Sequence, residues 1–438
     1  MIKNIYHQQK KKNNEIASKY PNFKHNYLIG VINGVIFNFG LSFFSRDTII
    51  PVYLASLGAP SLVISFVALF DSLGWYFPQL FVAKYLLHLE EKLPIYKRAV
   101  FLRIFGILLA VFSANLAFNI ESKSYALITF VLGFGIFCFS GGISGVVFTD
   151  IVYKTVPKEK RGTYFAWRAI GSGIIGIYAG VGIIKPIIKN YEYPLNYLIL
   201  FSSGAVLMLV AFILFFYTKE PKDKNVLLEE RTFKKQIKTA VTILKQNKTY
   251  RNFVLLQCLM NLWFAGVPFV MLYAKENLGA IDIQIGEFIT WGFAGTIISN
   301  LLLGYISNQI GNKSLMVTGT ISALFVSISL LVFPYLSIPF WTFGFIFFAS
   351  ATAETGISTG SMNYMLETVP EEDRTTYIGL KNTLSAFAYC IAALIGSLRD
   401  IYGARSIFYV TGVIAIAALF LLYFLPEPRA KLMIKVYE

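Results

Sequence analysis

The stretch LILFSSGAVLMLVAFILFF, from Leu198 to Phe216, contains no charged side chain in 19 residues. At a rise of about 1.5 Å per residue, a helix of this length nearly crosses a hydrocarbon core about 30 Å thick. The stretch does not alternate between apolar and polar residues, as the strands of a membrane barrel do over roughly ten residues. Backbone groups in lipid must find their partners within the segment, so this stretch predicts a membrane-spanning helix.

Similar stretches recur along the whole chain. Of the 438 residues, 56% are hydrophobic and 14% are charged, and the mean hydropathy is +0.60. This balance indicates a membrane solvent rather than water. The apolar runs predict an all-α polytopic membrane protein with twelve transmembrane helices, at residues 27–55, 61–85, 99–118, 124–149, 163–184, 195–217, 252–274, 284–305, 314–334, 338–365, 376–396 and 405–425.

The formal net charge of +15 is compatible with a nucleic-acid partner, but the charges lie between and outside the apolar runs. We therefore interpret them as topological signals and expect no nucleic-acid partner. With the N-terminus inside, 39 Lys and Arg divide unequally, and only seven face outside: Arg46, Lys123, Lys185, Lys189, Lys275, Arg399 and Arg405. This asymmetry predicts an integral protein of the cell membrane with both termini in the cytoplasm.

A long polar segment rich in Lys and Glu interrupts the apolar runs once, between the sixth and the seventh. It predicts a domain boundary. The first apolar run is too long for the hydrophobic part of a signal peptide, so we expect a retained span. The predicted organisation is a cytoplasmic tail at 1–26, a six-helix bundle at 27–217, a cytoplasmic linker at 218–250, a second six-helix bundle at 251–425 and a cytoplasmic tail at 426–438.

Short motifs recur in the same order in both bundles, which indicates an internal duplication. Single tripeptides recur by chance, but an ordered series at matching places rarely does. Leu57-Gly58-Ala59 recurs as Leu278-Gly279-Ala280. Thr155-Val156-Pro157, followed by Arg161 and Arg168, recurs as Thr368-Val369-Pro370, followed by Arg374 and Lys381. Glu220-Pro221 recurs as Glu427-Pro428.

Twelve spans in two parallel halves, cytoplasmic termini and a charged central linker resemble the major facilitator superfamily over nearly the whole chain. The segment from Gly304 to Lys313, GYISNQIGNK, is similar to its Gly-x-x-Asp-x-x-Gly-x-Arg/Lys element, with Ser307 in place of the acid. The resemblance implies a charge relay with an acid at the cytoplasmic end of the fourth span, where Asp150 stands, and Asn363 is the counterpart in the second half. The gate candidates on this basis are Asp150, Arg161, Arg374, Gly304, Gly311 and Lys313.

Polar side chains within the spans are candidates for solute binding, because a charge in hydrocarbon is costly unless it faces a cavity or a partner. Asn38, Ser42 and Arg46 follow at intervals of four and predict one polar stripe on a helix. Asp47 lies about 100° round the same helix, where it either contacts another helix or reaches the outer surface. The full set of binding candidates is Asn38, Arg46, Asp71, Trp75, Gln79, Asn261, Trp263 and Trp291.

Glu354 is the leading candidate for proton coupling. It lies near the middle of the tenth predicted span, on a stripe with Ser350, Ser358 and Ser361. A carboxyl in an apolar cavity can exchange protons near neutrality. No histidine lies in any predicted span, so the other proton candidates are Asp71 and Asp47.

Arg168 and Lys381 are equivalent in the repeat, each about one turn inside the cytoplasmic edge of its span. They are candidates for an inner gate that bonds acids or helix carbonyls of the facing half; snorkelling to the membrane surface is the alternative. No cluster has metal-ligand spacing and no nucleophile lies beside a base, so we expect no catalytic residue, metal or cofactor.

These observations favour a secondary transporter that moves a small solute by alternating access, coupled to protons or not. The sequence lacks a P-loop, which argues against ATP-driven transport. The glycine-rich fifth span is similar to that of drug antiporters, so a drug/proton antiporter-type exporter is one alternative, and a receptor that binds without translocating is another. One arginine and three acids suit a zwitterion, a cation, a polar neutral solute or an amphipathic drug. The expected partners are a small solute, membrane lipid and protons, and we expect a monomer.

Overall fold

The computed structural model describes residues 20–86, 89–119, 123–222, 242–369 and 374–429, and helices form the regular structure of these ranges. Residues 20–222, here called the N-half, contain α2 (Phe23–Ser42), α3 (Ile49–Ser56), α4 (Ser61–Ala68), α5 (Phe70–Leu86), α6 (Leu93–Asn119), α7 (Lys123–Thr155), α8 (Lys158–Tyr178), η1 (Ala179–Ile184), α9 (Lys185–Asn190) and α10 (Leu195–Phe216).

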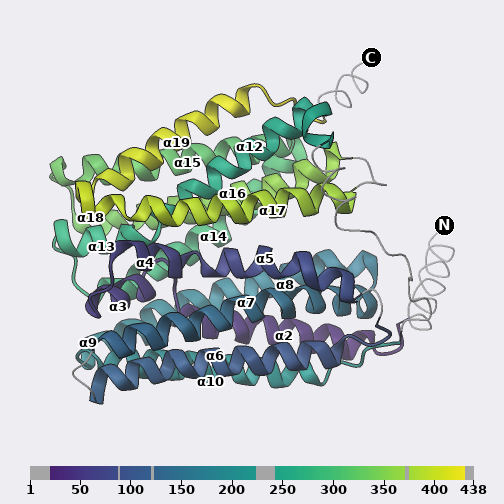
Figure 1. Cartoon of the computed structure of the whole chain (residues 1–438), viewed down its shortest axis with the longest axis horizontal. Coiled ribbons are helices and arrows are strands. Elements are labelled where there is room, and N and C mark those ends of the chain that lie inside the picture. Colours follow the sequence, from purple (N-terminus) through teal and green to yellow (C-terminus); the bar gives the residue numbers. More distant parts are fainter. Residues whose placement is uncertain (1–19, 87–88, 120–122, 223–241, 370–373, 430–438) are drawn as a thin grey trace, which may run out of the picture.

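Residues 242–429, the C-half, form a second bundle beside the first (Figure 1). They contain α12 (Lys248–Trp263), η2 (Phe264–Gly266), α13 (Pro268–Asn277), α14 (Gln284–Gln309), α15 (Asn312–Val332), η3 (Phe333–Tyr335), η4 (Phe340–Phe343), α16 (Gly344–Thr368), α17 (Arg374–Gly396), α18 (Leu398–Tyr402) and α19 (Ser406–Tyr423). The helices of both halves run roughly along the long axis of the molecule.

The helices of both halves begin and finish at two opposite ends of the molecule (Figure 1). The terminal end is where α2 and α17 begin and where α10 and α19 finish. The far end is where α3, α9, α13 and α18 lie. The long helices therefore run between the terminal end and the far end of the molecule.

Each predicted span coincides with a helix or with consecutive helices. Within the described ranges, nine helical stretches are long and apolar enough to cross a membrane, or ten if the bent pair Ser61–Ala68 and Phe70–Pro78 forms one span. The helices α2 and α16 are not among them, and they carry buried or cavity-facing polar residues such as Asn33 and Glu354. The prediction of an all-helical protein with many membrane spans is confirmed.

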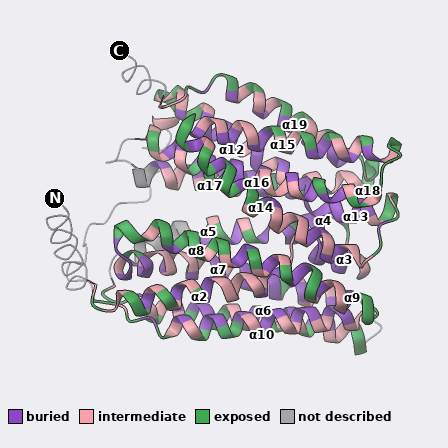
Figure 2. Cartoon of the chain, turned by 180° about the vertical axis from the view of Figure 1, so that it is seen from behind, coloured by how far each residue is buried: buried purple, intermediate pink, exposed green. Residues whose placement is uncertain are grey.

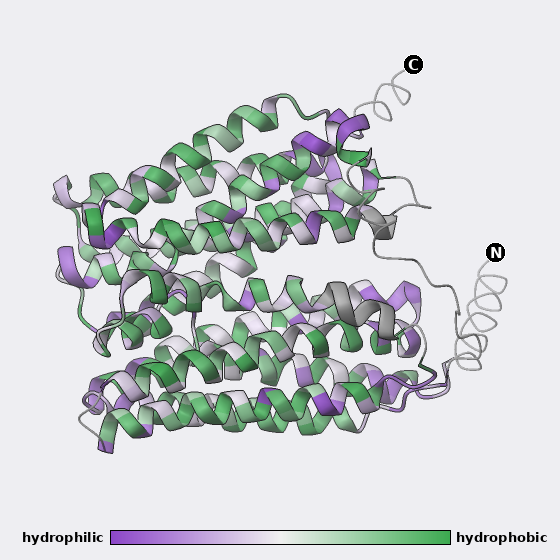
Figure 3. Ribbon diagram, viewed as in Figure 1, coloured by the Kyte–Doolittle hydropathy of each residue, from purple (hydrophilic) through white to green (hydrophobic). Residues whose placement is uncertain are grey.

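Large apolar side chains cover the outside of the bundles. Leu301, Val413 and Phe420 are 66%, 67% and 66% exposed although they lie within apolar helices. Figure 2 shows exposed residues along the outer faces of the helices, and Figure 3 shows hydrophobic residues along the helix lengths with hydrophilic ones concentrated towards both ends. Such a surface suits a hydrocarbon solvent, since water would penalise it.

One of the repeated sequence motifs has the same backbone conformation in both halves. Gly58 and Gly279, the middle residues of the repeated Leu-Gly-Ala motif, both adopt positive φ angles, of 79° and 75°. Each follows the end of a short helix, α3 or α13, where glycine adopts this left-handed conformation without the steric cost of a Cβ. The same sequence motif therefore makes the same turn in both halves.

The expectation of continuous helices over 27–55, 61–85 and 252–274 is wrong. The first is interrupted between Ser42 and Ile49, the second bends by 49° around Leu69, and the third changes to a 3₁₀ turn at η2. Pro268 at the start of α13 has no N–H to donate, so it is accepted at the beginning of a helix but would remove a bond within one. Arg46 and Asp47 consequently lie in a helix break, and the predicted stripe from Asn38 does not continue to Arg46.

Candidate functional site

A single arginine gathers three carboxylates between the two halves. The Arg46 guanidinium Nη1 lies 3.1 Å from Oδ2 of Asp71, and its Nε lies 3.5 Å from Oδ1 of Asp47. Its Nη2 donates a hydrogen bond to Oε1 of Glu354, which belongs to the C-half. The structure thus brings four predicted residues into one group, here called the Arg46 cluster.

The Arg46 cluster borders a small cavity between the halves. Its walls come from the three interrupted helical stretches together with α16 and α17, and the lining residues are Arg46, Asp47, Ala68, Leu69, Ser72, Phe264, Val267, Pro268, Glu354 and Tyr389. Interrupted helices leave backbone groups and helix ends free near the middle of a membrane protein, which is where transporters commonly bind ions and solutes. The helix breaks that the sequence did not reveal are therefore what forms the cavity.

The balance of charge in this cluster is negative. One guanidinium faces three carboxylates, so the four groups carry two net negative charges when all are ionised. The side chains of Arg46, Asp71 and Glu354 are 27%, 65% and 45% exposed. Partial exposure keeps the cost of ionisation moderate, and the excess negative charge favours a proton or a cationic group at this place.

Two stacked tyrosines extend the site towards the terminal end. Tyr389 lines the cavity, and its ring lies parallel to that of Tyr76 from the N-half, with 6.0 Å between centroids and 17° between planes. The ammonium Nζ of Lys381 lies 5.8 Å from the centroid of the Tyr76 ring. Lys381 and Tyr389 both lie on α17 and both contact Tyr76, so this part of α17 faces the N-half.

Other binding candidates from the N-half lie apart from the cavity lining. Asn38 donates to the carbonyl of Gly34 and to the Ser172 hydroxyl, at 2.9 and 3.0 Å. Trp75 packs against Gly145, where an added Cβ would come within 2.2 Å of the indole. The side chain of Gln79 lies outside the described part of the structure.

The C-half candidates lie within its own helix packing. Trp263 is 2% exposed, and its indole Nε1 donates to the Ala323 carbonyl at 3.2 Å. Asn261 is 1% exposed and accepts a hydrogen bond from the Gln257 amide at 3.2 Å. Trp291 lies beside Gly344 and contacts the ring of Phe345, with 4.8 Å between ring centroids. Their roles in solute binding stay predictions.

The gate candidates Arg168 and Arg161 contact carbonyl oxygens of their own half. Arg168 donates to the carbonyl of Gly30 and lies with its guanidinium 4.7 Å from the Phe148 ring centroid. Arg161 donates to the carbonyls of Tyr153 and Val156, at 2.7 and 3.0 Å. The side chain of Arg374 lies outside the described residues.

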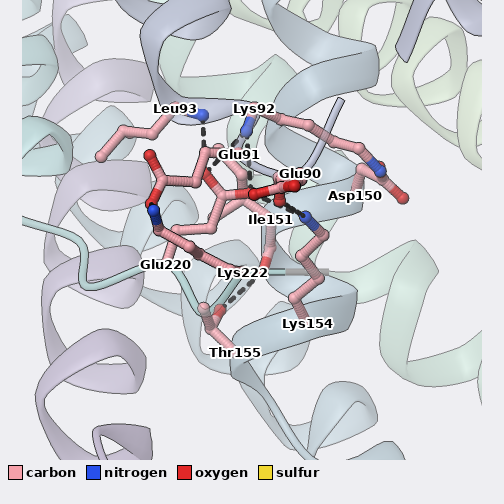
Figure 4. Close-up of polar contacts among 10 residues, drawn as sticks. All are labelled: Glu90, Glu91, Lys92, Leu93, Asp150, Ile151, Lys154, Thr155, Glu220 and Lys222. Carbon is pink, nitrogen blue, oxygen red and sulfur yellow. Dashed lines mark hydrogen bonds and ion pairs between the residues drawn. The ribbon is translucent and has the colours of Figure 1, made fainter. Parts of the chain in front are cut away.

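Asp150 belongs to a polar group at the terminal end, drawn in Figure 4. Its carboxylate pairs with the ammonium of Lys92, just before α6. The Glu220 carboxylate, which follows α10, accepts from the backbone N–H groups of Lys92 and Leu93 and lies 2.9 Å from Nζ of Lys154. Lys92 and Lys154 were not among the predicted gate residues.

The same arrangement recurs in part at the terminal end of the C-half. The Glu427 carboxylate accepts from the N–H of Lys313 at 3.0 Å, at the start of α15. Gly311, with φ of 114°, leaves no room for a Cβ, which would lie 2.4 Å from that carboxylate. The Asn363 amide donates to Asn312 at 3.2 Å, where the N-half has the charged pair of Lys92 and Asp150. The repeated Glu-Pro motif was the sequence signal for both caps. Gly304, in contrast, has open space around its Cα.

Polar contacts also join the two halves towards the far end. The Asp400 carboxylate accepts from the N–H and the hydroxyl of Ser61, at 2.9 and 2.5 Å, and so caps α4 from the opposite half. Lys185 of the N-half pairs with Glu287 of the C-half, with 2.5 Å between Nζ and Oε1. Sequence reasoning missed these residues because no local pattern indicates which loops of the two halves meet.

Comparisons with known proteins agree with this architecture. The sequence profile described as Major Facilitator Superfamily matches residues 253–435. A protein described as an uncharacterised MFS-type transporter from Methanocaldococcus jannaschii is 28% identical over 160 residues. This match covers 36% of the present chain and 39% of that relative, so it spans less than half of either protein.

Two solved structures share the fold across nearly their whole length. A crystal structure of a D-xylose–proton symporter superposes with a TM-score of 0.69 at 15% identity, covering 93% of this chain and 99% of the other. A bacterial homologue of the iron transporter ferroportin in an inward-facing state gives a TM-score of 0.66 at 15% identity, covering 91% and 98%. They show the same fold, while the profile match and the sequence relative show that the chain belongs to the major facilitator superfamily, a family of membrane transporters rather than enzymes.

Proposed function

We propose that this protein is a secondary transporter that moves a small solute by alternating access and couples the movement to protons through Glu354. The observation that carries the proposal is the contact between Arg46 and Glu354, which joins the two halves at the cavity. A link of this kind changes when the halves move, and it changes when Glu354 takes up a proton. Conformation and protonation then depend on the same pair of side chains.

All twelve predicted helical segments cross the membrane in this proposal, with residues 27–217 and 251–425 as the two moving bundles. The less apolar composition of α16 fits its place beside the cavity, where Glu354 lies, and that of α2 fits its packing against α8 and α10, where Asn33 donates to the Ala211 carbonyl. The excess of Lys and Arg supports a cytoplasmic location for the terminal end and an outside location for the far end. The tails at 1–26 and 426–438 and the linker at 218–250 are then cytoplasmic.

The contacts between the halves favour a state that is closed on the outside. Asp400 with Ser61 and Lys185 with Glu287 join the halves towards the far end. Close backbone approach supports the same closure, since a Cβ on Gly180 would lie 2.5 Å from the Gly286 carbonyl. Opening to the outside requires these contacts to separate, while the gate candidates at the terminal end, including Arg168 and Lys381, would come together in the opposite state.

Protonation of Glu354 provides the coupling step. When Glu354 is ionised, the Arg46 guanidinium is shared between this residue of the C-half and Asp47 and Asp71 of the N-half. A proton on Glu354 cancels its charge, so Arg46 stays with the two aspartates and the ionic link between the halves weakens. Solute and proton therefore act on one equilibrium and are thermodynamically linked.

Solute-driven proton movement in proteoliposomes tests this function. The purified chain is reconstituted with a pH-sensitive dye inside, and a broad library of solutes is added outside. The parent should move protons with at least one solute, and Glu354→Gln should bind or counter-exchange that solute without moving protons. Asp282→Asn, which removes a carboxylate paired with Lys275 away from the cavity, is the matched control and should behave as the parent. Unchanged proton movement in Glu354→Gln would contradict the coupling role.

A further inference from the structure

Lys381 places a buried positive charge between the halves without a negative partner in the described part of the chain. Its side chain lies on α17 and is 8% exposed. Its ammonium lies over the face of the Tyr76 ring, 5.8 Å from the ring centroid. A face of an aromatic ring attracts a cation only weakly compared with a carboxylate, so the burial of this ammonium is poorly compensated.

A second polar group near this position lacks a hydrogen-bond partner. Ser385 lies one helical turn from Lys381 on α17, is 1% exposed, and its hydroxyl is unpaired. An ammonium and a hydroxyl are both donors, which an anionic group can satisfy together.

The position of Lys381 relative to the acids defines the shape of the ligand. The Tyr76 ring contacts both this ammonium and the ring of Tyr389, and Tyr389 lines the cavity at the Arg46 cluster. The tyrosine pair therefore links the positive end of the site to the negative end. A solute that carries opposite charges at its two ends fits both, whereas a simple cation or anion fits one.

We propose that Lys381 binds the anionic group of a dipolar organic solute whose cationic group is held by Asp71, Asp47 and Glu354. This inference rests on the proposed transport function and names the class of its substrate. The cationic group of the solute competes with Arg46 for the carboxylates, and its anionic group supplies the counter-charge that Lys381 lacks. The tyrosine pair contacts the part of the solute between its charges.

Stability without any solute is the first test, and it uses Lys381→Met and Lys381→Arg in the purified full chain. Removing a buried charge that has no partner should raise the Tm by at least about 2 °C in Lys381→Met, because the cost of desolvating the ammonium disappears. A fall in Tm would mean that Lys381 has a structural partner and would overturn the proposal. Lys275→Gln, which removes a lysine from an ion pair outside the cavity, is the charge-matched control and should not raise the Tm.

Selectivity for charge is the second test. Four solutes of increasing length, β-alanine, diglycine, 6-aminohexanoate and triglycine, are each compared with their amide, their N-acetyl derivative and their N-acetyl amide. At least one dipolar form should stabilise the parent against heat, more than the three derivatives of the same skeleton. The apparent affinity for that dipolar form, derived from the thermal stabilisation, should fall at least about tenfold in Lys381→Met. Lys381→Arg should retain part of this affinity, and Lys275→Gln should retain all of it.

Three outcomes would overturn the assignment: stabilisation by amides or neutral forms alone, equal stabilisation of Lys381→Met, or no stabilisation by any dipolar form. Failure here is separable from failure of the proposed function. Solute-driven proton movement with unchanged charge selectivity in Lys381→Met would leave the transport proposal in place and remove Lys381 from it. Lysine-dependent binding without translocation would do the reverse.

Discussion

Arg46 donates a hydrogen bond to Glu354, a residue 308 positions later in the chain and on the opposite half of the molecule. The same guanidinium lies 3.1 Å from Asp71 in its own half. Arginine suits this position because its planar group offers several donors at fixed angles, so it can contact more than one carboxylate at a time. A lysine would have a single charged nitrogen for the same task.

The first prediction concerns this cluster. Arg46→Gln leaves three carboxylates close together without their cation, so the free energy of unfolding should fall by about 1–2 kcal/mol, discounted for partial exposure. The double variant Arg46→Gln/Glu354→Gln removes one of the repelling charges and should regain part of that loss. Thermal unfolding of the four proteins forms a double-mutant cycle. Strict additivity of the two changes would contradict a direct interaction.

A second prediction concerns the far end. Asp400→Asn removes the charge that caps the first turn of α4 across the two halves and should weaken outer closure by about 1 kcal/mol. Distances between spin labels at Asn190 and Ile281 should then include a larger fraction of long values. Asp282→Asn, at an acid paired within the C-half, provides the control. A distribution identical to that of the parent would show that Asp400 does not hold the halves together.

A third prediction compares the two repeated caps. Glu220 is 3% exposed, pairs with Lys154 and accepts two backbone N–H groups, so Glu220→Gln should cost about 2–4 kcal/mol of stability. Glu427→Gln should cost less, because Glu427 accepts mainly from the N–H of Lys313. The melting temperatures of the two variants show which substitution costs more stability. An equal or reversed order would mean that Lys154 does not determine the difference.

A fourth prediction is topological. Cysteines placed at Lys160, at the terminal end, and at Lys123, at the opposite end, should react with a membrane-impermeant reagent from opposite sides. The parent for this test lacks Cys138, Cys258 and Cys390. Lys160 should be protected in intact cells and Lys123 labelled. Labelling of both from one side would contradict the proposed orientation.

The positions of the helices follow from the sequence because spans, loops and repeated motifs are local patterns. The breaks at Ser42 to Ile49 and around Leu69 were not predicted, since hydropathy records how apolar a stretch is and not whether its axis is continuous. The sequence did identify Arg46 and Glu354 as unusual charges within spans. Their contact could not be predicted, because it depends on how two separate bundles pack against each other.

The polar group at the terminal end shows a similar limit. Asp150 was identified through resemblance, while its partner Lys92 was not, because an exposed-looking lysine before a helix has no distinctive local signal. The sequence identified Glu220 and Glu427 only as members of a repeated Glu-Pro motif. Their role as caps appears once the start of one helix and the end of another are brought together in space.

The most direct test of the account is the effect of pH on the distance between the halves, measured with spin labels at Asn190 and Ile281, with a second pair at Lys160 and Gln309. Where Glu354 is ionised, its link to Arg46 should favour short distances at the far end. As pH falls and Glu354 takes up a proton, the fraction of long distances between Asn190 and Ile281 should increase. The labels at Lys160 and Gln309 should move closer together.

Glu354→Gln should show the low-pH distribution of distances at every pH, and Glu354→Asp, which can still titrate, should keep the response of the parent. Asp47 and Asp71 contact the same guanidinium and remain in all three proteins, so their titration is common to them. A pH response in Glu354→Gln equal to that of the parent would contradict the claim that Glu354 couples protons to the movement of the halves.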